Sequence, residues 1–221
     1  MKKPHVFPHT SWAAKSLWSI ELKSLSVLLC ALTSIGFGEG LLLLSDLGSA
    51  PWTVLSQGVA TQGQFSVGWA SWMISLIVML AWFPLKLKPG LATVINIFVI
   101  AFVLGITTYL LQKPTALYAR FAYAIVGILL FGIGTAFYLT CHQGSGPRDG
   151  LMVGLCQHFH WKIGIVRTSI EVLVCMFGFL LGGVLGIGTL MFAFGIGWVV
   201  QYTLFFISRV PYFRHKTDNV I

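Results

Sequence analysis

The sequence predicts an all-α, polytopic membrane protein with six transmembrane helices, arranged as two inverted three-helix repeats that each carry a short re-entrant or interfacial helix. Three observations support this prediction. The 221 residues are 57% hydrophobic and only 9% charged, whereas about a quarter of the residues of soluble domains are charged. Six separate apolar runs are long enough to cross a bilayer, which takes about 20 helical residues. The two halves of the chain also share a pattern of Gly, Ser, Pro and Thr residues.

The first 23 residues are basic and lead into the first apolar run without a small-residue cleavage site, so we expect a retained first span. The six expected spans are 24–45, 67–85, 90–111, 120–141, 164–185 and 187–208. They divide the chain into a cytoplasmic N-terminal segment (1–23), a first membrane repeat (24–112), a second membrane repeat (120–208) and a cytoplasmic C-terminal tail (209–221).

Two short segments separate spans within the repeats. They read PWTVLSQGVATQ and PRDGLMVGLCQHFH, and each begins with proline after a serine and a small residue. Proline is favoured in the first turn of a helix, so both segments are expected to be helical. Each is too short to cross the membrane alone.

The repeat becomes visible when the chain is shifted by 96 residues, which aligns 36–103 with 132–199 without a gap. The matched pairs include Gly36 with Gly132, Gly38 with Gly134, Gly48 with Gly144, Ser49 with Ser145, Pro51 with Pro147, Gly58 with Gly154, Gly68 with Gly164, Gly90 with Gly186 and Thr93 with Thr189. Such matches at one offset indicate a tandem repeat. Three crossings per repeat require the second copy to be inserted upside down.

The distribution of positive charge agrees with that topology. With the N-terminus inside, the inner loops and termini carry Lys2, Lys3, Lys15, Lys23, Lys86, Lys88, Arg148, Lys162, Arg167, Arg209, Arg214 and Lys216, and the outer loops carry Lys113 and Arg120. Inner loops are expected to be richer in Lys and Arg. Both termini are therefore predicted to be cytoplasmic.

Several classes of function are not expected. The net charge of +8 comes from short clusters between apolar runs, so it sets orientation and does not indicate a nucleic-acid partner. His158 and His160 stand near Cys156, but residues two apart on a helix point to different faces, and we expect no metal site. No catalytic arrangement is evident, so neither an enzyme nor a cofactor is predicted.

Five stretches carry a family resemblance: LGSAPWTVLSQG, WFPLKLKPGLATVIN, GSGPRDGLM, VRTSIEV and LLGGVLGIGT, between about residues 34 and 200. Through these stretches the chain resembles the YczE/YyaS/YitT family of bacterial integral membrane proteins, and most of all its YczE branch. The resemblance implies a multi-pass protein of the bacterial cytoplasmic membrane. It implies no particular substrate.

The stretch GSGPRDGLM supplies the first candidate site residues: Ser145, Gly146, Arg148 and Asp149. Unpaired N–H groups and the dipole at a helix start favour an anion, and Ser49 stands at the matching place in the first repeat. Structural roles are the alternative for both charged residues. Asp149 stabilises a first helical turn, and Arg148 is a topology charge.

Two glutamates are candidates for carrying a coupling proton. Glu39 lies well inside the first span, where a carboxylate costs about 3 kcal/mol. Its alternative role is a protonated acid bonded to a neighbouring helix. Glu171 follows Arg167 by four residues, which predicts an ion pair on one helix face. In a functional role Arg167 would be a second anion contact and Glu171 a second proton carrier.

The remaining polar and aromatic residues receive structural interpretations. Asn96 and Gln201 are expected to form hydrogen bonds between helices. The tryptophans near span ends are interpreted as interfacial anchors: Trp12, Trp18, Trp52, Trp69, Trp82 and Trp161.

The leading functional hypothesis is a secondary transporter or permease for a small anionic or zwitterionic solute, with proton coupling through Glu39 and a site between the two repeats. Its partners would be the lipid bilayer and that solute, and a homodimer stays open. The alternative is a scaffold or accessory membrane protein that binds another protein and transports nothing. The short chain and the glycine packing faces suit that alternative.

Overall fold

The structure, a computed structural model, describes residues 10–161 and 163–210. Over these residues the chain forms eight helices: α1 (Leu22–Leu44), α2 (Pro51–Gly63), α3 (Val67–Leu80), α4 (Leu91–Leu110), α5 (Leu117–Leu139), α6 (Pro147–Phe159), α7 (Ile163–Leu180) and α8 (Ile187–Arg209). The all-helical prediction is confirmed for this part of the chain.

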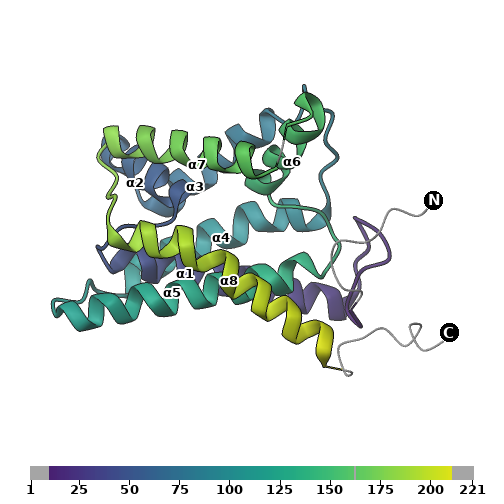
Figure 1. Cartoon of the computed structure of the whole chain (residues 1–221), viewed down its shortest axis with the longest axis horizontal. Helices are drawn as coiled ribbons and strands as arrows, with labels where there is room; N and C mark the ends of the chain where they lie inside the picture. The colour runs from purple at the N-terminus through teal and green to yellow at the C-terminus, as the bar shows by residue number, and fades with distance from the viewer. Residues whose placement is uncertain (1–9, 162, 211–221) are drawn as a thin grey trace.

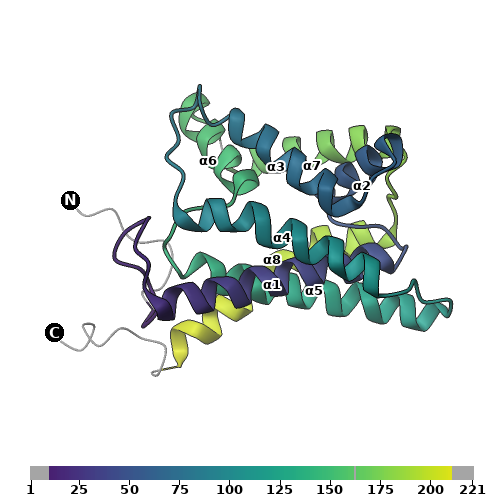
Figure 2. The same cartoon turned by 180° about the vertical axis from the view of Figure 1, so that it is seen from behind.

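The helices lie in two layers (Figure 1 and Figure 2). The long helices α1, α4, α5 and α8 form one layer, in which α1 packs against α4 and α5, and α5 packs against α8. The shorter helices α2, α3, α6 and α7 form the other, in which α2 and α6 each pack against α3 and α7. We call these the long-helix layer and the short-helix layer. Side chains that reach from one layer to the other therefore meet in the middle of the protein.

Four of the described helices, α1, α4, α5 and α8, are long and apolar enough to cross a membrane, and α2 with α3 forms a fifth candidate, bent by 114°. The expected span 67–85 is helical only over Val67–Leu80, because residues 81–86 form turns and Pro84 cannot continue a helix. At 1.5 Å per residue α3 is about 21 Å long, less than a hydrocarbon core of about 30 Å.

The 96-residue offset seen in the sequence reappears in the backbone. Helices α2 and α6 begin at Pro51 and Pro147, and α4 and α8 begin at Leu91 and Ile187. Left-handed backbone conformations also recur in matched pairs: Asp46 with His142, Gly48 with Gly144, Gln64 with His160, and Lys86 with Gly182. The two halves of the chain therefore have the same local structure.

Contacts between α1 and α5 show how the halves are related. The Ser34 hydroxyl donates a hydrogen bond of 2.9 Å to the Leu130 carbonyl, and these residues are equivalent at the 96-residue offset. Gly38 packs against Gly127, and Gly134 packs against Ala31, so α1 and α5 run in opposite directions. These contacts are reciprocal at the 96-residue offset, and we describe them by a local pseudo-two-fold axis that passes between the two helices.

The loops before α2 and α6 make equivalent hydrogen bonds, which the same pseudo-two-fold axis relates. The Leu47 carbonyl accepts a bond of 2.7 Å from the Gly188 N–H, and the equivalent Gln143 carbonyl accepts one of 3.0 Å from the Ala92 N–H. The loop before α2 is thus bonded to the first turn of α8, and the loop before α6 to the first turn of α4. This exchange holds the short helices over the long-helix layer.

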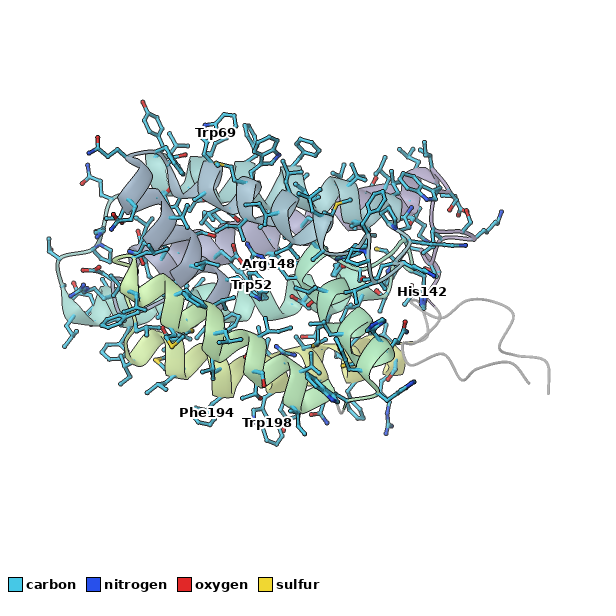
Figure 3. All side chains as sticks on the ribbon, turned by 90° about the horizontal axis from the view of Figure 1, so that it is seen from above. Trp52, Trp69, His142, Arg148, Phe194 and Trp198 are labelled. Carbon is cyan, nitrogen blue, oxygen red and sulfur yellow. The ribbon has the colours of Figure 1, made fainter. Side chains whose placement is uncertain are left out.

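Large apolar side chains cover the outer edges of the protein (Figure 3). Trp69 lies at one edge and is 62% exposed, and Phe194 and Trp198 lie at the opposite edge and are 77% and 61% exposed. A surface of this kind is typical of a protein that contacts lipid or another apolar partner. The tryptophan interpretation is wrong for Trp12 and Trp82, which are buried and donate hydrogen bonds of 3.0 Å to Thr140 Oγ1 and to the Pro147 carbonyl.

The two ends of the helices are held by different kinds of contact. At the end bearing the first turn of α1, Ser19 accepts a hydrogen bond from Gln143, and Leu17 accepts one from Leu91. At the other end Arg120 binds the Ser45 carbonyl at 2.8 Å and the Asp46 carboxylate, and Lys113 lies 3.4 Å from that carboxylate. The two basic residues of the expected outer loops are therefore both paired with one acidic residue.

Candidate functional site

The centre of the protein contains an ion pair between the two layers. Glu39 on α1 and Arg148 on α6 are 3.1 Å apart between Oε1 and Nη1. The Glu39 side chain is 1% exposed and the Arg148 side chain is 19% exposed. The structure thus brings together two residues that the sequence indicated separately and that are 109 positions apart.

Two further side chains complete the surroundings of Arg148. Its second terminal nitrogen donates a bond of 3.0 Å to Ser71 Oγ on α3, and its guanidinium carbon lies 5.5 Å from the centre of the Trp52 ring on α2. Figure 3 shows Arg148 and Trp52 side by side near the middle of the molecule. Four helices, α1, α2, α3 and α6, therefore supply the side chains of one compact group.

The start of α6 is held in place by its neighbours. Gly146 caps the helix without a side chain, Pro147 occupies the first position, and Arg148 follows. The Trp82 indole binds the Pro147 carbonyl, and its ring lies so close to Gly150 that a methyl group there would collide with it. Glycine at this position lets Trp82 reach the helix start.

Several buried oxygen atoms of Glu39 and of the residues that begin α2 lack a hydrogen-bond partner among the described residues. Glu39 Oε2 is one, and the hydroxyls of Thr53 and Ser49 are two others. Each of these side chains is 1% exposed, and Thr53 stands beside the Glu39 carboxyl. An unpaired buried polar group costs about 1–3 kcal/mol. A molecule that donated a hydrogen bond to Glu39 Oε2 would offset this cost.

Ser145 and Gly146 are placed against α4. The Ser145 carbonyl accepts a bond of 2.7 Å from Thr93 Oγ1, and Gly146 lies against the Asn96 amide, 3.0 Å from where its Cβ would stand. Both residues thus help to seat the start of α6 on α4. Their glycine and serine pattern is explained by this close approach.

Asp149, Arg167 and Glu171 form a second, more exposed group. Arg167 Nε lies 2.9 Å from Glu171 Oε1, which confirms the predicted ion pair along α7. Asp149 is exposed on α6 and within electrostatic reach of Arg148 and Arg167. Within the described part of the chain no hydrogen bond joins this group to Glu39. The predicted site residues therefore separate into an inner pair and an outer group.

Sequence reasoning missed Ser71 and Thr53, and it misassigned Trp52 as an interfacial anchor. A usable signal existed for Trp52, because Trp52 is equivalent to Arg148 at the 96-residue offset and contacts it. Residues that are equivalent across a two-fold axis and lie near it come into contact. Aligning the repeats alone does not show which positions lie near the axis.

No group of three His, Cys, Asp or Glu side chains in the described residues is placed to hold a metal ion. An apolar groove of about 470 Å³ lies elsewhere, between α3 and α4, and none of the predicted site residues lines it. Its lining residues are Ser66, Gly68, Trp69, Trp72, Phe98, Ala101, Phe102, Gly105 and Ile106.

The fold and this buried ion pair define a polytopic helical membrane protein with a polar centre. Residues 22–204 match a family of unknown function, DUF6198, and the chain belongs to that family. An uncharacterized protein of Haemophilus influenzae is 58% identical over 215 residues, which are 97% of this chain and 99% of that protein.

Two relatives come from Bacillus subtilis. The uncharacterized membrane protein YczE is 24% identical over 172 residues, covering 77% of this chain and 80% of YczE. The uncharacterized protein YyaS is 27% identical over 161 residues, covering 71% of this chain and 80% of YyaS. The resemblance seen in the sequence motifs is confirmed. No solved structure matches the chain.

Proposed function

We propose that the protein is a secondary transporter of the bacterial cytoplasmic membrane. In this proposal residues 24–112 and 120–208 are two inverted repeats with three crossings each, both termini are cytoplasmic, and α2 and α6 are re-entrant. Support comes from the antiparallel α1 and α5, the pseudo-two-fold axis between them, and the bend of α2 against α3. Inverted repeats with broken helices near the centre are a recurrent plan of such transporters.

The observation that carries the proposal is the Glu39–Arg148 pair between the layers. Charged side chains inside a membrane segment are costly, and they commonly mark the path of a solute or a proton. Buried ion pairs also contribute little net stability compared with well-packed apolar residues. A structural role alone therefore gives a poor account of this pair.

The chemistry of the pair suits coupled binding of a proton and an anion. A proton on Glu39 removes the negative partner of Arg148 and leaves the guanidinium free for a carboxylate or another small anion. When the proton and the anion leave, the two side chains pair again. Opposite charges thus enter and leave the buried site together, which avoids a net buried charge.

A zwitterionic solute can use the same residues. Its carboxylate would bind Arg148 and its ammonium group the unpaired Glu39 Oε2, with Thr53 and Ser71 as hydroxyl partners. The Trp52 ring would form the apolar wall of the site. Arg167 would serve as an outer anion contact, with Glu171 as the second proton carrier. Asp149 and Ser49 complete the proposed set.

The first test is a search for a ligand with the purified protein. A ligand that binds only the folded state raises the melting temperature. We expect one or more compounds from a panel of acetate, lactate, benzoate, phosphate and the common amino acids to do so. If none of these and no wider metabolite panel stabilises the protein, the scaffold hypothesis is favoured.

The second test measures uptake of the stabilising compound into proteoliposomes with an inward proton gradient. Glu39→Gln should abolish acceleration by the gradient, and Arg148→Ala should abolish uptake. Lys113→Ala is the matched control, because Lys113 is 61% exposed and pairs only at the far end of the helices. Unchanged uptake in both site variants would refute the assignment of Glu39 and Arg148.

A further inference from the structure

The two halves differ in how the short-helix layer meets the long-helix layer. In the first half α3 lies directly on α4, since Gly68 packs against the Ala101 carbonyl and Gly105, and the rings of Trp72 and Phe98 are 6.4 Å apart. We call this contact the α3–α4 seam. The two helices are in contact here and Ala101 is 5% exposed, while the apolar groove described above lies along the outer face of this seam, where Trp69, Phe98 and Phe102 are exposed.

The equivalent contact of the second half is open. Among the described residues α7 packs against α2 and α6, and it does not pack along α8. Gly197, the equivalent of Ala101, is exposed, and a methyl group added there would meet no atom within 4 Å. Gln201, the equivalent of Gly105, is exposed as well. We call this region the α7–α8 seam.

Helix α7 is held away from α8 by a close contact with α2. Gly178 packs against the backbone of Val54 and Leu55, and Gly58 packs against Leu181 and the Gly178 carbonyl. Two side-chain bonds reinforce it, from the Val184 N–H to Gln57 at 2.9 Å and from Gln62 to the Leu181 carbonyl at 3.0 Å. The short-helix layer is therefore seated on the first half and raised from the second.

Polar groups are found on the helices of the open seam. Arg167 is 53% exposed, and Thr168 on α7 and Gln201 on α8 are exposed too. A charged group facing hydrocarbon costs about 3 kcal/mol or more, whereas a charged group in a water-filled opening does not. Asp149 lies within electrostatic reach of both Arg167 and Arg148, so a charged group stands between α7 and the buried pair.

We infer that the α7–α8 seam is the route by which a solute reaches Arg148 in this conformation, and that the α3–α4 seam is the route in a second conformation. This inference rests on the proposed transport function. In the second conformation the short-helix layer rocks about an axis that runs along the helices, perpendicular to the pseudo-two-fold axis, so that α7 settles on α8 and α3 leaves α4. Gly197 offers α7 the small surface that Ala101 offers α3.

The test places one cysteine pair across each seam at equivalent positions, in a chain whose native cysteines are replaced by alanine. Trp72→Cys with Phe98→Cys spans the closed seam, and Thr168→Cys with Phe194→Cys spans the open one. A short bis-methanethiosulfonate reagent links each pair, and intact-mass spectrometry counts the linked pairs. No solute is required.

We expect the first pair to be linked at least tenfold faster than the second in the resting protein. In a chain that contains all four cysteines, one link should form per molecule, because closing one seam opens the other. Two links in most molecules, or equal rates for the two pairs, would overturn the inference. Circular dichroism and melting temperature of each variant establish that it is folded.

The cross-linking result and the uptake result test the two proposals separately. If the seams close alternately but no compound is carried, the inference about motion stands and the transport function fails. If a compound binds at Arg148 and is carried while both seams link together, transport stands and the inference fails. Reduction of the link at the first seam should restore uptake in a transporting protein.

Discussion

Arg148 and Trp52 occupy equivalent positions in the two halves, 96 residues apart, and the guanidinium carbon lies 5.5 Å from the centre of the indole ring. Two identical arginines at this axis would repel each other, and two tryptophans would leave Glu39 without a cation. An arginine over an aromatic face is attractive by about 0.5–2 kcal/mol. The pair must therefore differ between the halves for the polar centre to exist.

Substitution of Trp52 tests this contact. Trp52→Phe keeps an aromatic face and should lower the unfolding free energy only slightly, whereas Trp52→Leu should lower it by about 1 kcal/mol more. Trp52→Arg should be the least stable, because a second guanidinium faces Arg148. The measurement is the unfolding midpoint in detergent, and an equal midpoint for the leucine and phenylalanine variants would contradict the prediction.

The Glu39–Arg148 pair predicts a specific pattern in a double-mutant cycle. Arg148→Met leaves a buried carboxylate unpaired and should cost about 3–5 kcal/mol. Glu39→Gln together with Arg148→Met should cost less than Arg148→Met alone, since no charge is left unpaired. Unfolding of the three variants at one pH measures the coupling. Additive losses would mean that the two side chains do not interact.

Two glycines offer a matched comparison of packing. A Cβ at Gly38 would lie 2.6 Å from the Gly127 carbonyl oxygen and 2.8 Å from the Phe131 nitrogen, so Gly38→Ala must separate α1 from α5. We expect a loss of about 1–3 kcal/mol. Gly197→Ala meets no atom and should be neutral or stabilising by up to about 1 kcal/mol. Thermal unfolding of both variants gives the comparison.

The proposed orientation can be checked by labelling from outside intact cells. Cysteines placed at Gln64 and Thr115 should react with a membrane-impermeant maleimide, and cysteines at Lys88 and His160 should not. All four positions are exposed in the structure, so failure to react reports the side of the membrane. The reverse pattern would place the termini outside.

The thiol of Cys141 should be unreactive although it lies beyond the end of α5. Burial raises the pKa of Cys141 to about 12. At pH 9 only about one thiol in a thousand is then a thiolate, the reactive form. In a chain that retains Cys141 alone, maleimide at pH 7 to 9 should label the protein only after denaturation. Rapid labelling of the folded chain would contradict this burial.

Much of the fold could be predicted because its signals are local or repeated. Apolar runs located the long helices, and the prolines at Pro51 and Pro147 marked the starts of α2 and α6 to the residue. The length of α3 could not be read from hydropathy, because the apolar run continues through the turns after Leu80. Composition records apolarity and does not record where a backbone turns.

The sequence identified the two charged residues of the candidate site but not their pairing or their other neighbours. A glutamate in an apolar run and an arginine at a helix start are each conspicuous, so both residues were identified. Their pairing depends on how the layers stack, and Ser71 and Trp52 belong to the site only through that stacking. The i and i+4 pair of Arg167 and Glu171 was predictable because it lies within one helix.

The hydrogen bond from Ser34 to its own counterpart, Leu130, bears on ancestry. A contact between matched positions is one that a half-length chain could make with a second copy of itself, lying antiparallel. Such an ancestor would have had to insert in both directions and could not have kept a strong charge bias. Under the proposed inverted topology, fusion of two copies into one gene would remove that restriction. Each half would then be free to acquire its own residues, an arginine in one and a tryptophan in the other.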